Sequence, residues 1–263
     1  MDKKSLAPLK KDGKALILAY DHGLEHGPSD FKENMETAEP ERVFKIASHE
    51  DVTCLAVQKG LAETYYDDYS DDVNLLLKLN GTTSMKGGVH YSPKNCTVER
   101  AVELGADALG YTLYPGSKME EKMFEDFREV QENARKHGLP LVVWAYPRGE
   151  EIEEDTTPEV VSYGARIGLE IGADMVKVKF PQTREGLEKV VSVIGDMDSV
   201  VSGGGMKTDK EFLEMVKTAV DVGCQGTAVG RNVWKRENPV KLVEALGDIF
   251  YRGKTVEEAL ERM

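Results

Sequence analysis

Two lysines stand two residues apart in the apolar stretch Met175-Val176-Lys177-Val178-Lys179-Phe180. Successive side chains of a β-strand alternate between its faces, so both lysines share one face if this stretch is a strand. The two residues then stand roughly 7 Å apart along the strand. Each disfavours the charged form of the other, and burial disfavours both. A lysine that is neutral near pH 7 attacks carbonyl carbon, so Lys177 is a candidate Schiff-base lysine with Lys179 as its cationic neighbour.

The same stretch also fits a simpler interpretation. Two lysines on an edge strand can lay their stems on apolar surface and keep their charges in water. An antiparallel strand with one wet face gives the same alternation of side chains. The two interpretations differ in what surrounds the strand, and that depends on the rest of the chain.

Residues suited to proton transfer end two other apolar stretches. Asp21 and His22 follow one of them, and Trp144, Tyr146 and Arg148 share one parity at the end of the other. Asp21 could be an ordinary turn or cap residue, and Tyr146 a core aromatic. At the ends of buried strands, a charged role beside a lysine is favoured for Asp21, and a proton-transfer role for Tyr146.

Glycines end two further apolar stretches, in the run Ser202-Gly203-Gly204-Gly205 and in the pair Gly230-Arg231. Backbone N–H groups approach an anion closely where no Cβ intervenes. The pair also precedes a predicted helix, whose N-terminus favours anions. A glycine run alone more commonly marks a flexible turn, but two such ends on neighbouring strands favour a phosphate site.

The two histidines His22 and His26 lie four residues apart in a stretch that we expect to be a loop. A loop does not bring such residues to one face as a helix does, and no glutamate or third histidine completes a metal set. We therefore expect no metal here.

Strand and helix patterns alternate along the chain and would position these residues. Strand candidates begin near residues 15, 52, 73, 107, 140, 174, 199 and 226. Glycines at helix ends, as in Glu103-Leu104-Gly105-Ala106-Asp107 and Glu170-Ile171-Gly172-Ala173-Asp174, precede several of them. The alternation predicts a parallel sheet, and eight units predict a single-domain (β/α)8 TIM barrel over residues 1–263. In that fold the chemistry lies at the carboxyl ends of the strands. Helices are predicted over 40–49, 119–137, 157–171, 183–194, 209–222, 239–251 and 255–262.

Composition narrows the class of protein. The chain has 263 residues, of which 40% are hydrophobic and 31% charged, as in a globular protein. The formal net charge of −13 argues against a nucleic-acid binder that relies on phosphate contacts. No apolar run reaches the ~20 residues that span a bilayer, and the three scattered cysteines predict no disulfide framework. We expect a cytoplasmic protein that binds neither nucleic acid nor membrane.

Long motifs run along almost the whole chain: Ala19-Tyr20-Asp21-His22-Gly23-Leu24-Glu25-His26-Gly27-Pro28, Leu77-Lys78-Leu79-Asn80-Gly81, Gly110-Tyr111-Thr112-Leu113-Tyr114-Pro115-Gly116, Val143-Trp144-Ala145-Tyr146-Pro147-Arg148-Gly149, Val176-Lys177-Val178-Lys179 and Ala228-Val229-Gly230-Arg231-Asn232-Val233-Trp234. Together they resemble the archaeal-type class I fructose-1,6-bisphosphate aldolases. The resemblance implies a (β/α)8 barrel that cleaves fructose 1,6-bisphosphate reversibly in glycolysis and gluconeogenesis. It also implies no metal and no cofactor, and a homo-oligomer built as a pentamer or a pair of pentamers.

The resemblance also implies roles for individual residues. Lys177 would form the Schiff base, Tyr146 would donate a proton, and Asp21 would support the catalytic lysine. The residues implied to line the substrate site are Asp21, His22, His26, Asp30, Trp144, Arg148 and Lys179. Those implied to hold a phosphate are Ser202, Gly203, Gly204, Gly230 and Arg231. Gly205-Met206-Lys207 departs from the family pattern, in which Pro-Lys directly follows two glycines, and leaves the part of Lys207 in phosphate binding open.

Three alternatives stay open at this point. A related Schiff-base aldolase or transaldolase-like enzyme would use the same lysine on another sugar phosphate, for example in the synthesis of aromatic precursors. A phosphate-binding barrel isomerase would use an acid–base pair and no covalent step. A sugar-phosphate binding protein would bind without turnover.

Overall fold

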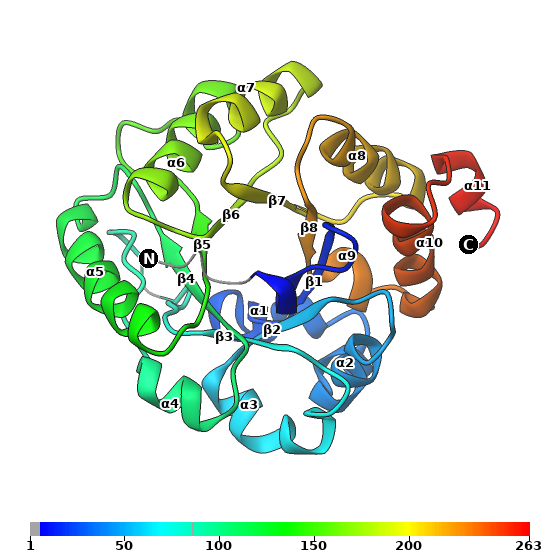
Figure 1. Cartoon of the computed structure of the whole chain (residues 1–263), viewed down its shortest axis with the longest axis horizontal. Coiled ribbons are helices and arrows are strands. Elements are labelled where there is room, and N and C mark those ends of the chain that lie inside the picture. Colours follow the sequence, from blue (N-terminus) through cyan, green and yellow to red (C-terminus); the bar gives the residue numbers. More distant parts are fainter. Residues whose placement is uncertain (1–5, 86) are drawn as a thin grey trace.

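Eight parallel strands close into a barrel in sequence order, with β8 hydrogen-bonded back to β1 (Figure 1). The structure, a computed structural model, describes residues 6–85 and 87–263. It confirms the predicted (β/α)8 fold and every predicted strand. The strands are β1 (Ala15–Ala19), β2 (Cys54–Gln58), β3 (Leu75–Lys78), β4 (Ala108–Leu113), β5 (Leu141–Ala145), β6 (Met175–Val178), β7 (Asp198–Ser202) and β8 (Gly226–Val229).

Helices form the outer ring around this barrel (Figure 1). Their order follows the strands, and the short 3-10 helix η1 (Ala7–Leu9) places the fully buried Leu9 against the inner side of the barrel. The α-helices are α1 (His22–Glu25), α2 (Pro40–Ala47), α3 (Lys59–Tyr65), α4 (Val98–Glu103), α5 (Glu120–Lys136), α6 (Pro158–Glu170), α7 (Arg184–Ile194), α8 (Asp209–Asp221), α9 (Arg231–Trp234), α10 (Pro239–Tyr251) and α11 (Val256–Leu260), and the other 3-10 helices are η2 (Gly27–Phe31), η3 (Met35–Ala38) and η4 (Asp67–Tyr69).

The strands are buried on both sides, and period-two alternation sorts their side chains. Ile17 and Met175 belong to the cluster inside the barrel, whereas Leu16 and Val176 pack outward in the cluster shared with the helices. The predicted helix-end glycines adopt the left-handed conformation, with φ of +83° at Gly172 directly before β6. The register that brings polar side chains to one end of the barrel follows from this alternation.

The structure differs from the sequence prediction mainly in the stretch after β1. Residues 22–30 were expected to form a loop, but they fold into α1 and the 3-10 helix η2. The last helix, α11, is also shorter than the predicted 255–262. The single turn of α1 brings the His22 and His26 rings together, with their centres 5.5 Å apart.

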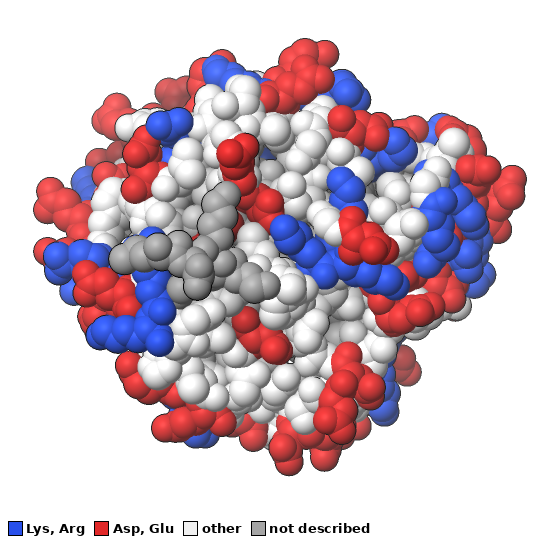
Figure 2. All heavy atoms as spheres, in the orientation of Figure 1, with Lys and Arg blue, Asp and Glu red and all other residues white. Residues whose placement is uncertain are grey.

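Acidic and basic side chains are interspersed on the face of the molecule shown in Figure 2. Many of them form ion pairs between neighbouring elements, such as Arg252 with the buried carboxylates of Asp51 and Asp248. Among the described residues, no helix is both long enough and apolar enough to cross a membrane.

Candidate active site

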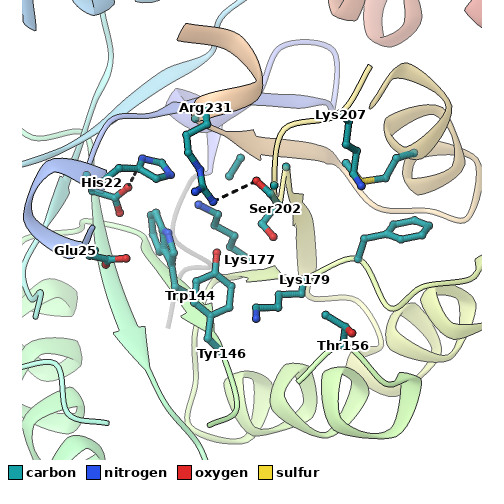
Figure 3. Close-up of a pocket in the computed structure, with 18 of the residues that line it drawn as sticks. His22, Glu25, Trp144, Tyr146, Thr156, Lys177, Lys179, Ser202, Lys207 and Arg231 are labelled. Atoms are coloured by element: carbon teal, nitrogen blue, oxygen red, sulfur yellow. Dashed lines mark hydrogen bonds and ion pairs between the residues drawn. The ribbon is translucent and has the colours of Figure 1, made fainter. Parts of the chain in front are cut away.

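A cavity of about 790 Å³ opens at the carboxyl ends of the strands, among the loops that follow them (Figure 3). It gathers every residue that the sequence assigned to catalysis or binding except Asp30. These lining residues are Asp21, His22, His26, Trp144, Tyr146, Arg148, Lys177, Lys179, Ser202, Gly203, Gly204, Gly230 and Arg231.

Lys177 is a buried lysine inside the barrel, so the interpretation as a surface lysine on an edge strand is wrong. It lies on β6 between Trp144 of β5 and Val200 of β7, and only 4% of it is exposed. Its ammonium nitrogen stands 4.8 Å from the centre of the Trp144 ring. Burial, together with the nearby charge of Lys78, lowers the pKa of Lys177 to about 8, although the negative charge of Asp21 opposes this. A fraction of the lysine is therefore neutral at physiological pH.

The prediction that Lys179 is the cationic neighbour of Lys177 is wrong. Lys179 has the right parity, but β6 ends at Val178 and the Lys179 ammonium forms an ion pair with Asp155. The positive charges that lower the pKa of Lys177 are instead those of Lys78 and Arg231. Lys179 still lines the cavity, where Figure 3 shows its side chain beside that of Tyr146.

Asp21 is buried at the end of β1 and forms an ion pair with a lysine that sequence reasoning missed. The ammonium of Lys78 on β3 lies 3.8 Å from the Asp21 carboxylate. Burial alone would raise the pKa of Asp21, but the charges of Lys78 and Lys177 bring it below its usual value. Asp21 is therefore an anion near the amine of Lys177.

Tyr146 follows β5 and points into the same space as Lys177 (Figure 3). Burial, together with the negative charges of Asp21 and Glu25, raises the pKa of Tyr146 well above its usual value, although a hydrogen bond with Ser202 opposes this. The phenol is therefore protonated and able to donate. Glu25 of α1, which the sequence did not single out, also lines the cavity, and burial raises its pKa too.

The loops after β7 and β8 form a glycine-lined cradle at the predicted phosphate site. Asn232, almost fully buried, donates hydrogen bonds to the carbonyls of Gly203 and Gly205 at 3.0 and 2.9 Å. It thereby fixes the glycine run to the start of α9. A Cβ at Gly230 would lie 2.2 Å from the His22 ring, so only glycine fits there. Lys207 also lines the cavity.

Arg231 presents a guanidinium to this cradle. One of its nitrogens lies 3.4 Å from the Gly204 carbonyl, and another lies 3.5 Å from the carboxylate of Asp30. Its buried Nε has no hydrogen-bond partner among the described residues. Asp30 itself accepts a hydrogen bond from His26 at 3.0 Å and lies behind both residues rather than on the cavity wall. A guanidinium with one buried nitrogen still free for a partner, beside a glycine-lined wall, suits an anion such as a phosphate.

The side chains described for the site do not form a set of metal ligands. Although α1 brings His22 and His26 together, the described part of the chain contains no group of three or more histidine, cysteine or acidic side chains suited to a metal ion. Burial lowers the pKa of His22 to about 4, so this imidazole is neutral. The arrangement offers a nucleophilic amine, a phenol, a carboxylate and a phosphate cradle within one cavity.

Comparison with known proteins gives a consistent result over most of the chain. A model of the DeoC/LacD family of aldolases matches residues 15–236. The fructose-bisphosphate aldolase class 1 of Halobacterium salinarum is 50% identical over 257 residues, which cover 98% of each chain.

Two similar solved structures share the fold and nearly half of the residues. One describes the mechanism of a Schiff-base-forming fructose-1,6-bisphosphate aldolase through its reaction intermediates; it has 45% identity, a TM-score of 0.87, and 91% and 95% of the two chains covered. The other is an archaeal fructose-1,6-bisphosphate aldolase with its catalytic lysine covalently bound to the carbinolamine intermediate of the substrate. It has 45% identity, a TM-score of 0.86, and coverage of 91% and 94%.

Proposed function

Because the chain belongs to the DeoC/LacD family of aldolases, and within it to the class 1 fructose-bisphosphate aldolases, we propose a role in its reaction for each residue of the cavity. The protein is a lyase that reversibly cleaves fructose 1,6-bisphosphate into dihydroxyacetone phosphate and glyceraldehyde 3-phosphate. It works through a lysine imine and needs no metal ion or cofactor.

The single observation that carries the role assignment is the buried amine of Lys177 at the centre of the polar cavity. In its neutral form this amine attacks the C2 carbonyl of the open-chain ketose, and loss of water gives a protonated imine. The imine withdraws electrons, so the C3–C4 bond breaks once the C4 hydroxyl has lost its proton. Glyceraldehyde 3-phosphate leaves, and Tyr146 protonates C3 of the remaining enamine. Hydrolysis then releases dihydroxyacetone phosphate and the free lysine.

The remaining cavity residues orient the substrate and stabilise charge. The Asp21 carboxylate lies near the amine and stabilises the positive imine. The glycines 203, 204 and 230, together with Ser202 and Arg231, hold one phosphate, and Arg148 contributes to holding the other. The residues assigned to contacts with the carbon chain are His22, His26, Trp144 and Lys179, with Asp30 orienting His26 and Arg231 from behind.

Coupled detection of both triose phosphates from fructose 1,6-bisphosphate tests the activity. Cleavage that persists with a chelator present is the expected result, and the same assay on ketose phosphates of other chain lengths separates this enzyme from relatives that act on another sugar phosphate. An isomerase or a binding protein would release no triose phosphate.

Imine formation is expected to depend on pH through Lys177. Burial lowers the pKa of this lysine to about 8, and only the neutral amine attacks. The rate of imine formation with dihydroxyacetone phosphate should therefore rise about tenfold per pH unit below this midpoint and level off above it. Rapid mixing with borohydride at a series of pH values measures the midpoint. A rate that is flat between pH 6 and about 10 would contradict the assignment of a titrating amine.

Gly230→Ala should weaken binding of the phosphorylated substrate. The new Cβ would lie 2.2 Å from the His22 ring and 2.6 Å from the Ala19 carbonyl oxygen. Displacing these groups costs about 1–3 kcal/mol, which corresponds to a rise in KM of roughly tenfold or more. Gly205→Ala is a matched control on the same rim, because a Cβ there meets nothing within 4 Å, and it should change KM far less. Equal effects of the two variants would remove the steric explanation.

Three wider assignments complete the proposal. We place residues 1–263 in one domain, because a single barrel accounts for the described residues. A cytoplasmic location is supported by the free, buried state of Cys54, Cys96 and Cys224 and by the nature of the substrate. Assembly as a pentamer or a decamer rests on the family resemblance. The mass of the purified protein from light scattering distinguishes a monomer, a pentamer and a decamer.

A further inference from the structure

A second lysine, Lys78, is buried beneath the active-site cavity, and the reaction scheme above does not use it. It ends β3, is 0% exposed, and is not among the residues that line the cavity. A buried ammonium is costly unless the structure pairs it. The residues that contact Lys78 therefore indicate its role.

Two contacts tie Lys78 to residues of the active site, and a third holds it to β4. Its ammonium lies 3.8 Å from the Asp21 carboxylate and 4.4 Å from the centre of the Trp144 ring. Trp144 lies in register with Lys177 on the next strand, and the Lys177 ammonium stands 4.8 Å from the same ring. Lys78 also donates a hydrogen bond to the hydroxyl of Thr112 on β4. The Trp144 indole thus lies against two ammonium groups, that of Lys177, which lines the cavity, and that of Lys78, which does not.

The neighbouring strands are built to hold Lys78 in this place. A Cβ at Gly110 would lie 2.8 Å both from the Lys78 stem and from the Trp144 ring, so the absence of a side chain on β4 lets these two residues meet. Asn80 holds the Thr112 backbone with hydrogen bonds of 2.8 Å in both directions. The Thr112 acceptor therefore has a fixed position.

We propose that Lys78 is a positioning residue of the aldolase reaction, which fixes the Asp21 carboxylate and the Trp144 ring and places a positive charge near the Lys177 amine. This inference rests on the proposed role of Lys177. Lys78 does not reach the substrate and acts only through the residues it touches.

The sign of its effect follows from the charges that face Lys177. Asp21 after β1 and Glu25 of α1 favour the charged amine, whereas Lys78 of β3 and Arg231 of α9 disfavour it. His22 of α1 is neutral, and the phenol of Tyr146 after β5 is protonated. Removing the Lys78 charge leaves the negative charge of Asp21 less compensated, which stabilises the charged, unreactive form of Lys177.

The test is the pH dependence of imine formation with dihydroxyacetone phosphate, followed by borohydride trapping in the intact protein. In Lys78→Met and in Lys78→Gln we expect the midpoint to rise by about one pH unit, so that the neutral fraction at pH 7 falls about tenfold. The glutamine variant keeps a donor for Thr112, and both variants should show the same shift because charge alone sets it. Lys10→Met is the matched control: it removes a partly buried lysine that is paired with Asp198 at the start of β7, at the end of the barrel opposite the cavity, and its midpoint should stay at that of the unaltered protein.

Each other outcome has a definite meaning. A folded Lys78 variant whose midpoint is unchanged or lower overturns the proposal, and so does a shift in Lys10→Met equal to that in Lys78→Met. If neither Lys78 variant folds, Lys78 is a structural residue and the proposal is wrong. If the unaltered protein forms no imine on Lys177, the proposed function itself fails, which the first measurement of the series reveals.

Discussion

Lys177→Met is expected to abolish cleavage of fructose 1,6-bisphosphate, lowering kcat by roughly 10⁵-fold or more, as removal of a covalent nucleophile does in other enzymes. Methionine has a similar length and fits the buried position between Trp144 and Val200. The fold should therefore be retained and is checked by thermal unfolding. The loss arises because the other amine against the Trp144 ring, that of Lys78, does not line the cavity and cannot replace the nucleophile.

The matched control for this variant is Lys179→Met, which removes the same group two residues further along the chain. That variant should still form the imine, whatever it does to substrate binding, because the Lys179 ammonium is engaged by Asp155. Measuring kcat and imine formation for both variants shows which of the two lysines is the nucleophile. Turnover that survives in Lys177→Met and fails in Lys179→Met would reverse the assignment of the two lysines.

Tyr146→Phe is expected to separate imine formation from proton transfer. Burial and nearby carboxylates keep the phenol protonated, and the proposed step donates its proton to the enamine carbon. Removing a proton-transfer group costs roughly 10²–10⁴-fold in rate. Turnover should fall by that factor, while borohydride should still trap the adduct on Lys177, since the amine is left unaltered.

A companion variant distinguishes proton transfer from packing around the phenol. Ser202→Ala removes the hydroxyl that bonds to Tyr146 but leaves the phenol in place, so its effect on turnover should be much smaller. Failure of Tyr146→Phe to form the imine would contradict the assigned role, because the phenol would then be needed before carbon–carbon bond cleavage.

The fold was predictable because its signals are local. Period-two alternation within each strand and the glycine at each helix end depend on neighbouring residues alone, and both are present before β6. The same local logic placed polar residues at the carboxyl ends of the strands. It therefore found most of the cavity wall, including the glycines of the phosphate cradle.

The partner of the catalytic lysine was not predictable in the same way. Parity along one strand favoured Lys179, but the residue that acts on Lys177 is Lys78, which lies three strands earlier in the chain and meets it only through closure of the barrel. The signal that could have found Lys78 was a lysine directly after the apolar run 75–77, facing a glycine on the next strand. Glu25 was missed because the stretch after β1 was taken for a loop, whereas α1 turns this side chain into the cavity.

The most direct test of a lysine-based mechanism is to locate the covalent adduct in the unaltered protein. The protein is incubated with dihydroxyacetone phosphate, reduced with borohydride and digested, and its peptides are mapped by mass. The structure predicts a single reduced adduct on Lys177, whose burial lowers its pKa to about 8. An adduct on Lys179, or triose phosphate release with no trapped adduct on any lysine, would contradict the account.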